Sequence, residues 1–498
     1  MDQEGRLPVV LLPRARFLPL LALAALYGCG PRATTSAADL THGVWIGESG
    51  GDRFLFELRG ASDSLSGVVH VMRQGKLESE LPIAHATYRP PELRMSMPAT
   101  GAAYEGHVDV AHGRIQGRLS YGQRQGPAMD LTWADPSALP GFRARAEAGP
   151  YSYREPDSGA DDWPVATPEE AGLDRGALAA LVNTIADGDA GLIHSIVVVR
   201  HDRLVLDEYF HGYGPADLHR LASATKSVAS LLVGAAIDRS LIPGPDAALA
   251  DFFPELADSL TPAWKEETLG DLLSMSMGLD WTANEAENVH GTGDAFFRHV
   301  FRRGVKDPPG TRWDYVNANV NLLAGVIFHA TGRHAEAFAA DVLFAPLGIG
   351  TWNWDYGKVD GYALMDGSLQ LRPRDMARIG ALVADSGRWQ GRQVVSARWI
   401  RESTRLRFHT GQPLGGYGYL WWLAELPTGQ GGEPMVVANG WGSQFILVFP
   451  RLDMVVVTTG GNEDNGRHLD FGRVLAGSLP ALVAGDEPAP VGPSTTRG

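Results

Sequence analysis

Short runs of alternating apolar and polar residues fill the chain from Thr41 to Ala134, and glycines and polar turn residues separate them. Residues 54–58 (Phe-Leu-Phe-Glu-Leu) and 104–110 (Tyr-Glu-Gly-His-Val-Asp-Val) are examples. Because successive side chains of a strand point to opposite faces, this period of two predicts half-buried strands joined by tight turns. We therefore expect a small all-β domain over residues 41–134, built as an antiparallel barrel or sandwich. No pattern within it indicates chemistry.

The pattern changes after this domain. Residues 135–167 are rich in Pro, Gly and acidic residues, which predicts a linker. Helical spacing and strand-like runs then alternate irregularly, so that residues 168–484 are expected to form an α+β domain. Residues 485–498 are rich in Pro, Gly and Ser and predict a disordered tail. The clearest expected elements are a helix over 176–187, a hairpin of strands 193–200 and 203–210, and a helix over 223–237.

Composition excludes several classes of site. Cys29 is the single cysteine of the 498-residue chain, which excludes an internal disulfide, a CxxC redox pair and a thiolate zinc site. The formal net charge of −15 makes nucleic acid an unfavourable partner, because an acidic surface repels phosphates. No zinc-protease motif or Walker loop occurs, and we expect neither a metal nor a cofactor. Lysine is scarce: it occurs only at positions 76, 226, 265, 306 and 358.

The N-terminus predicts export. Basic residues precede the apolar run 17–26, which is too short to span a bilayer but fits the core of a signal peptide. Residues 26–29 (Leu-Tyr-Gly-Cys) resemble a bacterial lipobox, whose cysteine is lipidated and becomes the mature N-terminus. We therefore predict a lipoprotein signal peptide over 1–28, lipidation of Cys29 and a polar tether over 29–40. The chain would then be anchored to a membrane in the bacterial cell envelope. A plain secretory signal with an incidental cysteine is the alternative.

Ser223 and Lys226 are three residues apart at the start of a predicted helix, which places both side chains on one face. A serine hydroxyl becomes a strong nucleophile only when a base removes its proton, and lysine, unlike arginine, can be that base. The alternative is a helix N-cap followed by a solvated lysine. The apolar run 228–237 predicts a buried helix, and together with the scarcity of lysine this favours the chemical interpretation.

Two further patterns lie downstream. Tyr315-x-Asn317 follows a Pro/Gly turn, and a phenol near a lysine can share its proton while an amide orients both. Residues 438–444 (Ala-Asn-Gly-Trp-Gly-Ser-Gln) precede a predicted strand. Glycines there let the backbone approach a ligand, which makes Gly440, Trp441 and Gly442 candidate substrate-binding residues. Alone, the first pattern would indicate a core aromatic with a helix N-cap, and the second an ordinary loop.

Together the three patterns resemble the serine β-lactamase/penicillin-binding family in its class C form, with S-x-x-K at Ser223 and Lys226 and Y-x-N at Tyr315 and Asn317. The resemblance covers roughly residues 169–484. It implies a β-lactamase/DD-peptidase-like fold, in which helices flank an antiparallel sheet and a helical subdomain lies beside it. Residue segments 268–280, 371–380 and 387–391 also resemble sequences of this family.

The third motif departs from the family. Penicillin-recognising members have K-T-G there, and its lysine helps to hold the substrate carboxylate. This chain has Ala438-Asn439-Gly440, or Trp441-Gly442-Ser443 in the other register, and neither contains lysine. The ending at Gln444 and the run 417–422 upstream are similar to the esterase and 6-aminohexanoate-dimer hydrolase branch.

The resemblance therefore implies a serine hydrolase of small or peptide-like esters or amides. Ser223 is the expected nucleophile, Lys226 its base and Tyr315 the proton shuttle, with Asn317 as an orienting amide. The N–H groups of Ser223 and Trp441 form the expected oxyanion hole. Activity as a D-alanyl peptidase, penicillin-binding protein or β-lactamase is one alternative, and a non-catalytic envelope lipoprotein that binds or scaffolds is another.

Two other patterns suggest a functional site, and each has a structural explanation. Gly47-Glu-Ser-Gly-Gly51 matches the G-x-S-x-G nucleophile elbow, but strands are predicted on both sides and favour a hairpin turn. Trp421, Trp422 and Trp441 are candidates for an apolar acyl pocket, with burial in the core as the default.

Overall fold

The computed structural model describes residues 40–483, except 62–63, 110–111, 123, 146, 148, 159–162, 260–261, 429–430 and 463–466. The predicted signal peptide, Cys29 and the tail over 485–498 lie outside the described residues, as does almost all of the tether. Within the described part, no helix has both the length and the apolar character needed to cross a membrane.

The N-terminal strands form a closed barrel. Their nine-stranded antiparallel sheet has the order β6-β5-β4-β3-β2-β1-β9-β7-β8. β6 also pairs with β7, which closes the barrel and leaves β8 paired with β7 alone. Apolar side chains such as Phe56, Leu93 and Tyr104 are buried inside, as the period of two predicts. Of the two expected architectures, the structure therefore has the barrel. The strands are β1 (Val44–Ser49), β2 (Asp52–Ala61), β3 (Ser64–Arg73), β4 (Lys76–Arg89), β5 (Glu92–Met97), β6 (Ala102–Asp109), β7 (Arg114–Tyr121), β8 (Arg124–Ala128) and β9 (Leu131–Ala134).

The G-x-S-x-G pattern lies in a hairpin. Ser49 pairs with Asp52, and Gly50 and Gly51 form the turn between β1 and β2 with φ of 65° and 93°. Positive φ at both central residues suits a tight hairpin turn and requires no side chain there. Ser49 is therefore not on a strand-to-helix elbow.

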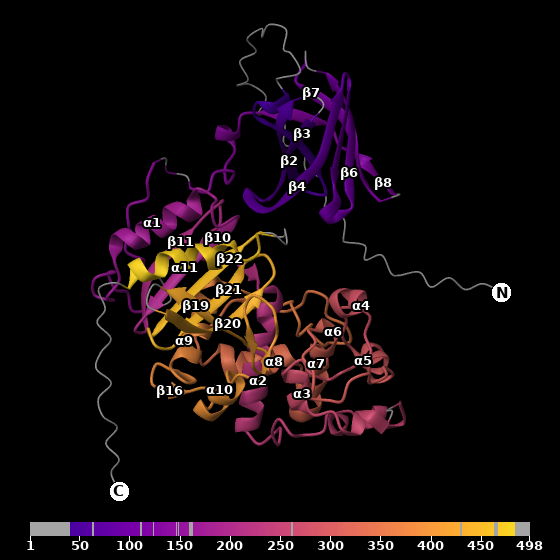
Figure 1. Cartoon of the computed structure of the whole chain (residues 1–498), viewed down its shortest axis with the longest axis vertical. Helices are drawn as coiled ribbons and strands as arrows, with labels where there is room; N and C mark the ends of the chain where they lie inside the picture. The colour runs from indigo at the N-terminus through magenta and orange to yellow at the C-terminus, as the bar shows by residue number, and fades with distance from the viewer. Residues whose placement is uncertain are drawn as a thin grey trace, which may run out of the picture.

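The second domain is built on an eight-stranded antiparallel sheet with the order β11-β10-β22-β21-β20-β19-β18-β17. The first strands of the domain thus pair with its last strand. Helices α1 and α11 lie together on one face, and α2 and α9 cover the other (Figure 1). The strands are β10 (Ile193–Arg200), β11 (Arg203–Tyr209), β17 (Phe408–His409), β18 (Gly416–Tyr417), β19 (Trp422–Thr428), β20 (Gly431–Gly440), β21 (Gln444–Phe449) and β22 (Met454–Gly460). The helices of this layer are α1 (Arg175–Ala186), α2 (Thr225–Asp238), α9 (Pro373–Ala384), α10 (Ala397–Ser403) and α11 (Asp470–Leu482).

Short helices form a subdomain beside the sheet (Figure 1). They are α3 (Leu269–Leu273), α4 (Ala283–Asn288), α5 (Asp294–Phe301), α6 (Asn317–Val320), α7 (Leu322–Thr331) and α8 (Ala335–Ala339), which continues into the π-helical turn η10 (Ala340–Phe344). Short ladders join β12 (His219–Arg220) and β13 (Trp352–Asn353) to β14 (Gln370–Leu371), and β15 (Arg388–Trp389) to β16 (Arg392–Gln393). The 3-10 turns are η2 (Pro98–Thr100), η4 (Pro136–Ala138), η6 (Ala222–Ala224), η7 (Leu249–Phe252), η8 (Pro254–Ser259) and η9 (Pro262–Lys265). The whole arrangement confirms the predicted α+β class.

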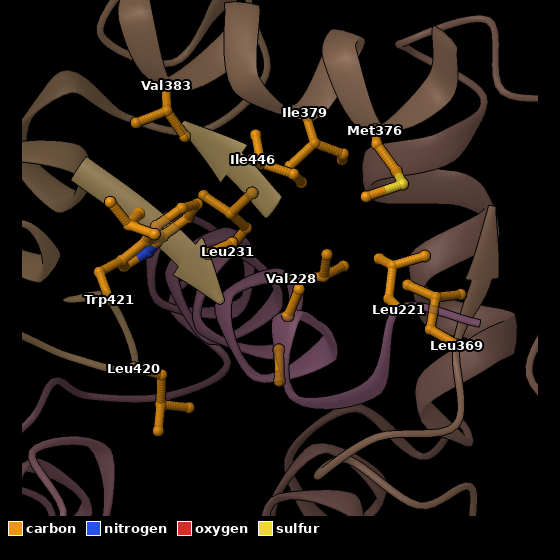
Figure 2. Close-up of a cluster of buried hydrophobic side chains, with 14 of the residues drawn as sticks. Leu221, Val228, Leu231, Leu369, Met376, Ile379, Val383, Leu420, Trp421 and Ile446 are labelled. Atoms are coloured by element: carbon orange, nitrogen blue, oxygen red, sulfur yellow. The ribbon is translucent and has the colours of Figure 1, made fainter. Parts of the chain in front are cut away.

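Helix α2 lies in the centre of the core. Val228 and Leu231 contact a cluster that includes Met376 and Ile379 of α9 and Ile446 of β21 (Figure 2). A Cβ at Gly234 would come within 2.1 Å of the Trp399 ring, so that only glycine allows this close approach. The apolar run in the sequence predicted this burial, which fixes the helix that begins beside Ser223.

The segment over 135–167 packs more closely than a free linker. Tyr151 and Trp163 are buried in the core of the second domain. The Tyr151 hydroxyl donates to Glu208 at 2.8 Å, and Trp163 Nε1 donates to the carbonyl of Asp202 at 3.0 Å. Two aromatic residues therefore attach this Pro/Gly-rich segment to the α+β domain.

Candidate active site

Ser223 lies in the 3-10 turn η6, immediately before α2, and its side chain is partly exposed. The preceding strand β12 pairs with β14, and Leu221 N donates to Leu369 O at 2.8 Å. Ala222 has φ of 45°, a conformation that a residue with a Cβ rarely adopts. The chain thus turns sharply from a fixed strand into the helix, and this turn presents Ser223 at the surface of a buried element.

Lys226 is directly beside the serine. Its side chain is 1% exposed, and Nζ donates to Ser223 Oγ at 2.8 Å. A second bond from Nζ reaches the carbonyl oxygen of Asp366, also at 2.8 Å. The structure therefore brings the two residues together, as the three-residue spacing predicted. Within the described part of the chain, no carboxylate is paired with the Lys226 amine.

Tyr315 joins the same site. Lys226 Nζ is 5.0 Å from the centroid of the Tyr315 ring. The ring stacks on Trp422 at a centroid distance of 5.8 Å and meets the edge of Tyr417 at 6.4 Å. Burial, with a smaller effect of Tyr315, raises the pKa of Tyr417 well above its ordinary value, so that Tyr417 stays a neutral phenol. Asn317 is partly buried and is the first residue of α6, two residues beyond Tyr315.

The end of strand β20 approaches the serine from the other side. A Cβ on Gly440 would be 1.9 Å from the carbonyl oxygen of Leu221, so that glycine is required for this contact. Trp441 follows at once, and Gly442 has φ of 85°, which turns the chain into β21. The third sequence pattern therefore lies against the turn that holds Ser223, the place where an oxyanion-hole donor is needed.

In the first of the two registers, the position of the missing lysine is Ala438. Ala438 is buried and, as side chains alternate along β20, is on the same face as Gly440. Asn439 is on the opposite face, where its Oδ1 is 3.0 Å from His468 Nε2. Burial lowers the pKa of His468 to about 4, so that this imidazole is neutral at pH 7 and does not replace the lysine charge.

The three candidate tryptophans have different environments. Trp421 is 0% exposed and packs in the cluster around α2, which confirms the default of burial in the core for this residue (Figure 2). Trp422 stacks on Tyr315 and contacts the candidate site through it. Trp441 is 45% exposed and stacks on His468 at 5.3 Å. Trp313 also packs on this aromatic group, which the sequence did not single out.

Sequence reasoning also missed Asp366 and its partners. Asp366 gives Lys226 its second hydrogen-bond acceptor, and its carboxylate accepts from His290 Nδ1 at 2.5 Å. Asn321 Oδ1 accepts from the backbone N–H groups of Met365 and Asp366. None of these residues belongs to a motif. The only available signal was the repeated asparagine at 317, 319 and 321.

Comparisons with known proteins agree with this geometry. Residues 183–470, which include all three patterns but not the barrel, match the family model described as Beta-lactamase. A 6-aminohexanoate-dimer hydrolase from Paenarthrobacter ureafaciens is 27% identical over 288 residues, or 53% of this chain and 71% of that protein.

Solved structures share the fold. A beta-lactamase-like protein from Bacteroides dorei has a TM-score of 0.52 at 18% identity, over 63% of this chain and 99% of its own. A 6-aminohexanoate-dimer hydrolase-like protein from Bacillus anthracis has a TM-score of 0.51 at 19% identity, over 64% of this chain and 88% of its own. At such identities these likenesses establish the fold alone.

Proposed function

The chain belongs to the β-lactamase family of serine hydrolases, and from this premise we propose that it cleaves an ester or amide through an acyl-enzyme on Ser223. One observation carries the proposal: the buried amine of Lys226 is 2.8 Å from Ser223 Oγ, within proton-transfer distance of a nucleophile at the surface of the site.

The proposed reaction has two halves. Neutral Lys226 takes the Ser223 proton while Oγ attacks the carbonyl carbon, and the N–H groups of Ser223 and Trp441 stabilise the oxyanion. Tyr315 passes the proton to the leaving alcohol or amine as the carbonyl–heteroatom bond breaks. Water then attacks the acyl-enzyme with the same groups in reverse, which releases the acid and restores Ser223. Asn317 orients the lysine and the substrate.

The substrate we propose is uncharged near its scissile bond. The position where penicillin-recognising members have a lysine is Ala438 in one register and Trp441 in the other, and neither side chain carries a charge. His468, which bonds to Asn439, is neutral at pH 7. Trp422 and Tyr417 pack on Tyr315 and on each other, and this aromatic group beside the site favours an apolar acyl or amine group. An amide of the kind named for the P. ureafaciens relative belongs in the first substrate set.

A fluorophosphonate probe tests the nucleophile. We expect the wild-type protein to be labelled with loss of fluoride, and the Ser223→Ala variant to remain unlabelled. Labelling that survives Ser223→Ala would refute the assignment. An unlabelled wild-type protein would favour the alternative of a non-catalytic lipoprotein that binds or scaffolds.

A paired substrate test separates the enzymatic alternatives. p-Nitrophenyl esters and short amides should be turned over, whereas a fluorescent penicillin should be neither hydrolysed rapidly nor retained as a stable adduct. Rapid penicillin turnover would establish β-lactamase activity instead. A long-lived penicillin adduct would favour a penicillin-binding or D-alanyl peptidase role.

We also propose that the protein acts in the bacterial cell envelope, anchored through a lipid on Cys29. The lipobox-like sequence is the support. Globomycin added to producing cells should block processing, and Cys29→Ser should abolish incorporation of labelled palmitate. Normal processing in the presence of globomycin would instead indicate a plain secretory signal.

A further inference from the structure

A neutral lysine amine has one lone pair and two N–H bonds, and it acts as a base only when the lone pair points at the proton to be removed. In Lys226, one of these directions around Nζ points at Ser223 Oγ. The Asp366 carbonyl oxygen, 2.8 Å from Nζ, accepts in another. Rotation of the amine is therefore restricted by the position of one backbone carbonyl.

The backbone just before that carbonyl is held by Asn321. The side-chain oxygen Oδ1 of Asn321 accepts from Met365 N at 2.7 Å and from Asp366 N at 3.1 Å. Asn321 is 0% exposed and lies where α6 meets α7, on the same segment as the Tyr315-x-Asn317 pattern. The second motif and the lysine of the first are thus joined through the backbone of Asp366, whose N–H bonds to Asn321 and whose carbonyl accepts from Lys226.

The side chain of Asp366 has a second support. Its carboxylate is 3% exposed and accepts a hydrogen bond from His290 Nδ1 at 2.5 Å, whereas the His290 side chain is 50% exposed. A buried carboxylate requires such a donor, since burial without one is costly. His290 comes from the loop between α4 and α5, so that the helical subdomain fixes Asp366 from outside the sheet.

We propose that Asp366, held by Asn321 and His290, is the positioning residue of the Lys226 base. These three residues are called the Asp366 clamp. The proposal rests on the hydrolase mechanism above and adds to it the group that orients the lysine. Loss of the His290 bond lets the Asp366 residue shift together with its carbonyl, and the Lys226 amine then points less often at Ser223. Because geometric errors near 1 Å change rates about 100-fold, partial release of the clamp is expected to slow acylation about tenfold.

The test uses the half-exposed member of the clamp, so that the core stays intact. His290→Phe keeps the ring and removes the Nδ1 donor. His290→Asn supplies an N–H near the position of Nδ1 and is the rescue variant. His329→Phe is the matched control, since it removes another histidine that pairs with a carboxylate, Glu255 at 3.5 Å, on helix α7. The full-length protein is reacted with a fluorophosphonate probe over a range of probe concentrations.

We expect His290→Phe to lower the maximal labelling rate about tenfold while the half-saturating probe concentration stays within about twofold. His290→Asn should recover at least half of the rate that His290→Phe loses, when both are measured on a logarithmic scale. His329→Phe should match the labelling rate of the wild-type protein. An unchanged rate in His290→Phe would overturn the clamp. Equal losses in all three variants, or a loss that follows a fall in the thermal midpoint, would also overturn it, because a structural defect then explains the rate.

The proposed function fails in a different way. If Ser223→Ala is still labelled, the nucleophile is wrong whatever His290 does. If labelling requires Ser223 but is indifferent to His290→Phe, the nucleophile stands and the positioning role of Asp366 is refuted.

Discussion

At residue scale, Lys226 combines properties that a solvated lysine lacks: full burial, a hydroxyl partner and a carbonyl partner. The sequence indicated it through the scarcity of lysine, the serine three positions before it, the apolar run that follows and the resemblance to the S-x-x-K motif. Its partner Asp366 is distant in the sequence and was not predictable, since no local pattern encodes a contact that depends on how two segments pack.

The role of Lys226 is tested by Lys226→Arg. Arginine keeps a positive charge and can bond to Ser223, but it cannot be deprotonated in a protein. We expect ester hydrolysis to fall by at least about a thousandfold, with folding unchanged by circular dichroism. Lys306→Arg, in a surface pair with Asp314, is the control and should retain full activity. Substantial hydrolysis by Lys226→Arg would contradict the base assignment.

Glu267 leads to a stability prediction. It is 0% exposed, and neither carboxyl oxygen has a hydrogen-bond partner among the described residues. Burial, with a smaller contribution from Asp271, raises the pKa of Glu267 from 4.5 to about 9. A carboxyl whose pKa is raised on folding gives its full stability below pH 4.5 and loses it as the pH rises toward 9, because the unfolded chain releases the proton more easily.

We therefore expect Glu267→Gln to stabilise the protein at pH 7 by about 1 to 3 kcal/mol, since the amide stays neutral in both states. The gain should shrink toward zero near pH 4.5 and grow toward pH 9. Chemical denaturation of both proteins across this range measures it. A difference between the variants that does not change with pH would contradict the buried neutral carboxyl.

At element scale, the site depends on the contact between β20 and the η6 turn. The sequence predicted a helix from Ser223, whereas α2 begins at Thr225 and Ser223 lies in a 3-10 turn after β12. The difference arises because β12 pairs with β14, a strand formed by residues far along the chain, and this pairing sets the angle at Ala222. Local periodicity contains no information on such a pairing.

Gly440→Ala tests this contact. The added Cβ would overlap the Leu221 carbonyl, and the strand end has to move away from Ser223. We expect kcat/KM for esters to fall by about 100-fold or more, because the oxyanion donor at Trp441 moves with the strand. Gly472→Ala in α11 meets no atom within 4 Å and is the matched control. Activity near the wild-type level in Gly440→Ala would show that β20 does not shape the site.

At the scale of the whole molecule, the barrel lies at the end of the hydrolase domain where β10, β11 and β22 are found (Figure 1). Lys76, at the start of β4, pairs with Asp217 at 2.5 Å, two residues before β12. Leu77 N donates to His211 O at 3.1 Å, and Leu192 packs in one cluster with Leu77. Barrel closure and docking were not predictable from the alternating pattern, which is the same in a sandwich.

Lys76→Met should weaken this docking. The pair is partly buried, so we expect a loss of about 1 kcal/mol and faster proteolysis between residues 135 and 167. Lys358→Met is the matched control, because Lys358 pairs with Glu336 at the same 2.5 Å distance but within one domain. Equal proteolysis rates in the two variants would indicate that the Lys76 pair does not hold the domains together.

The sequence by itself determined the fold class, the family and the pairing of Ser223 with Lys226. The fold class depends on periodicity together with the family resemblance, and the family depends on that resemblance in three motifs. The Ser223–Lys226 pairing depends on spacing within one helical turn, where covalent geometry places the side chains. Only the tertiary structure decided that the barrel closes, that Trp421 is core, and that Gly440 touches the nucleophile turn. It also decided that Asn321 and His290 hold Asp366, whose carbonyl accepts from the lysine. These contacts join segments far apart in the chain, and their positions are set by the packing of α2 and the sheet rather than by any local pattern.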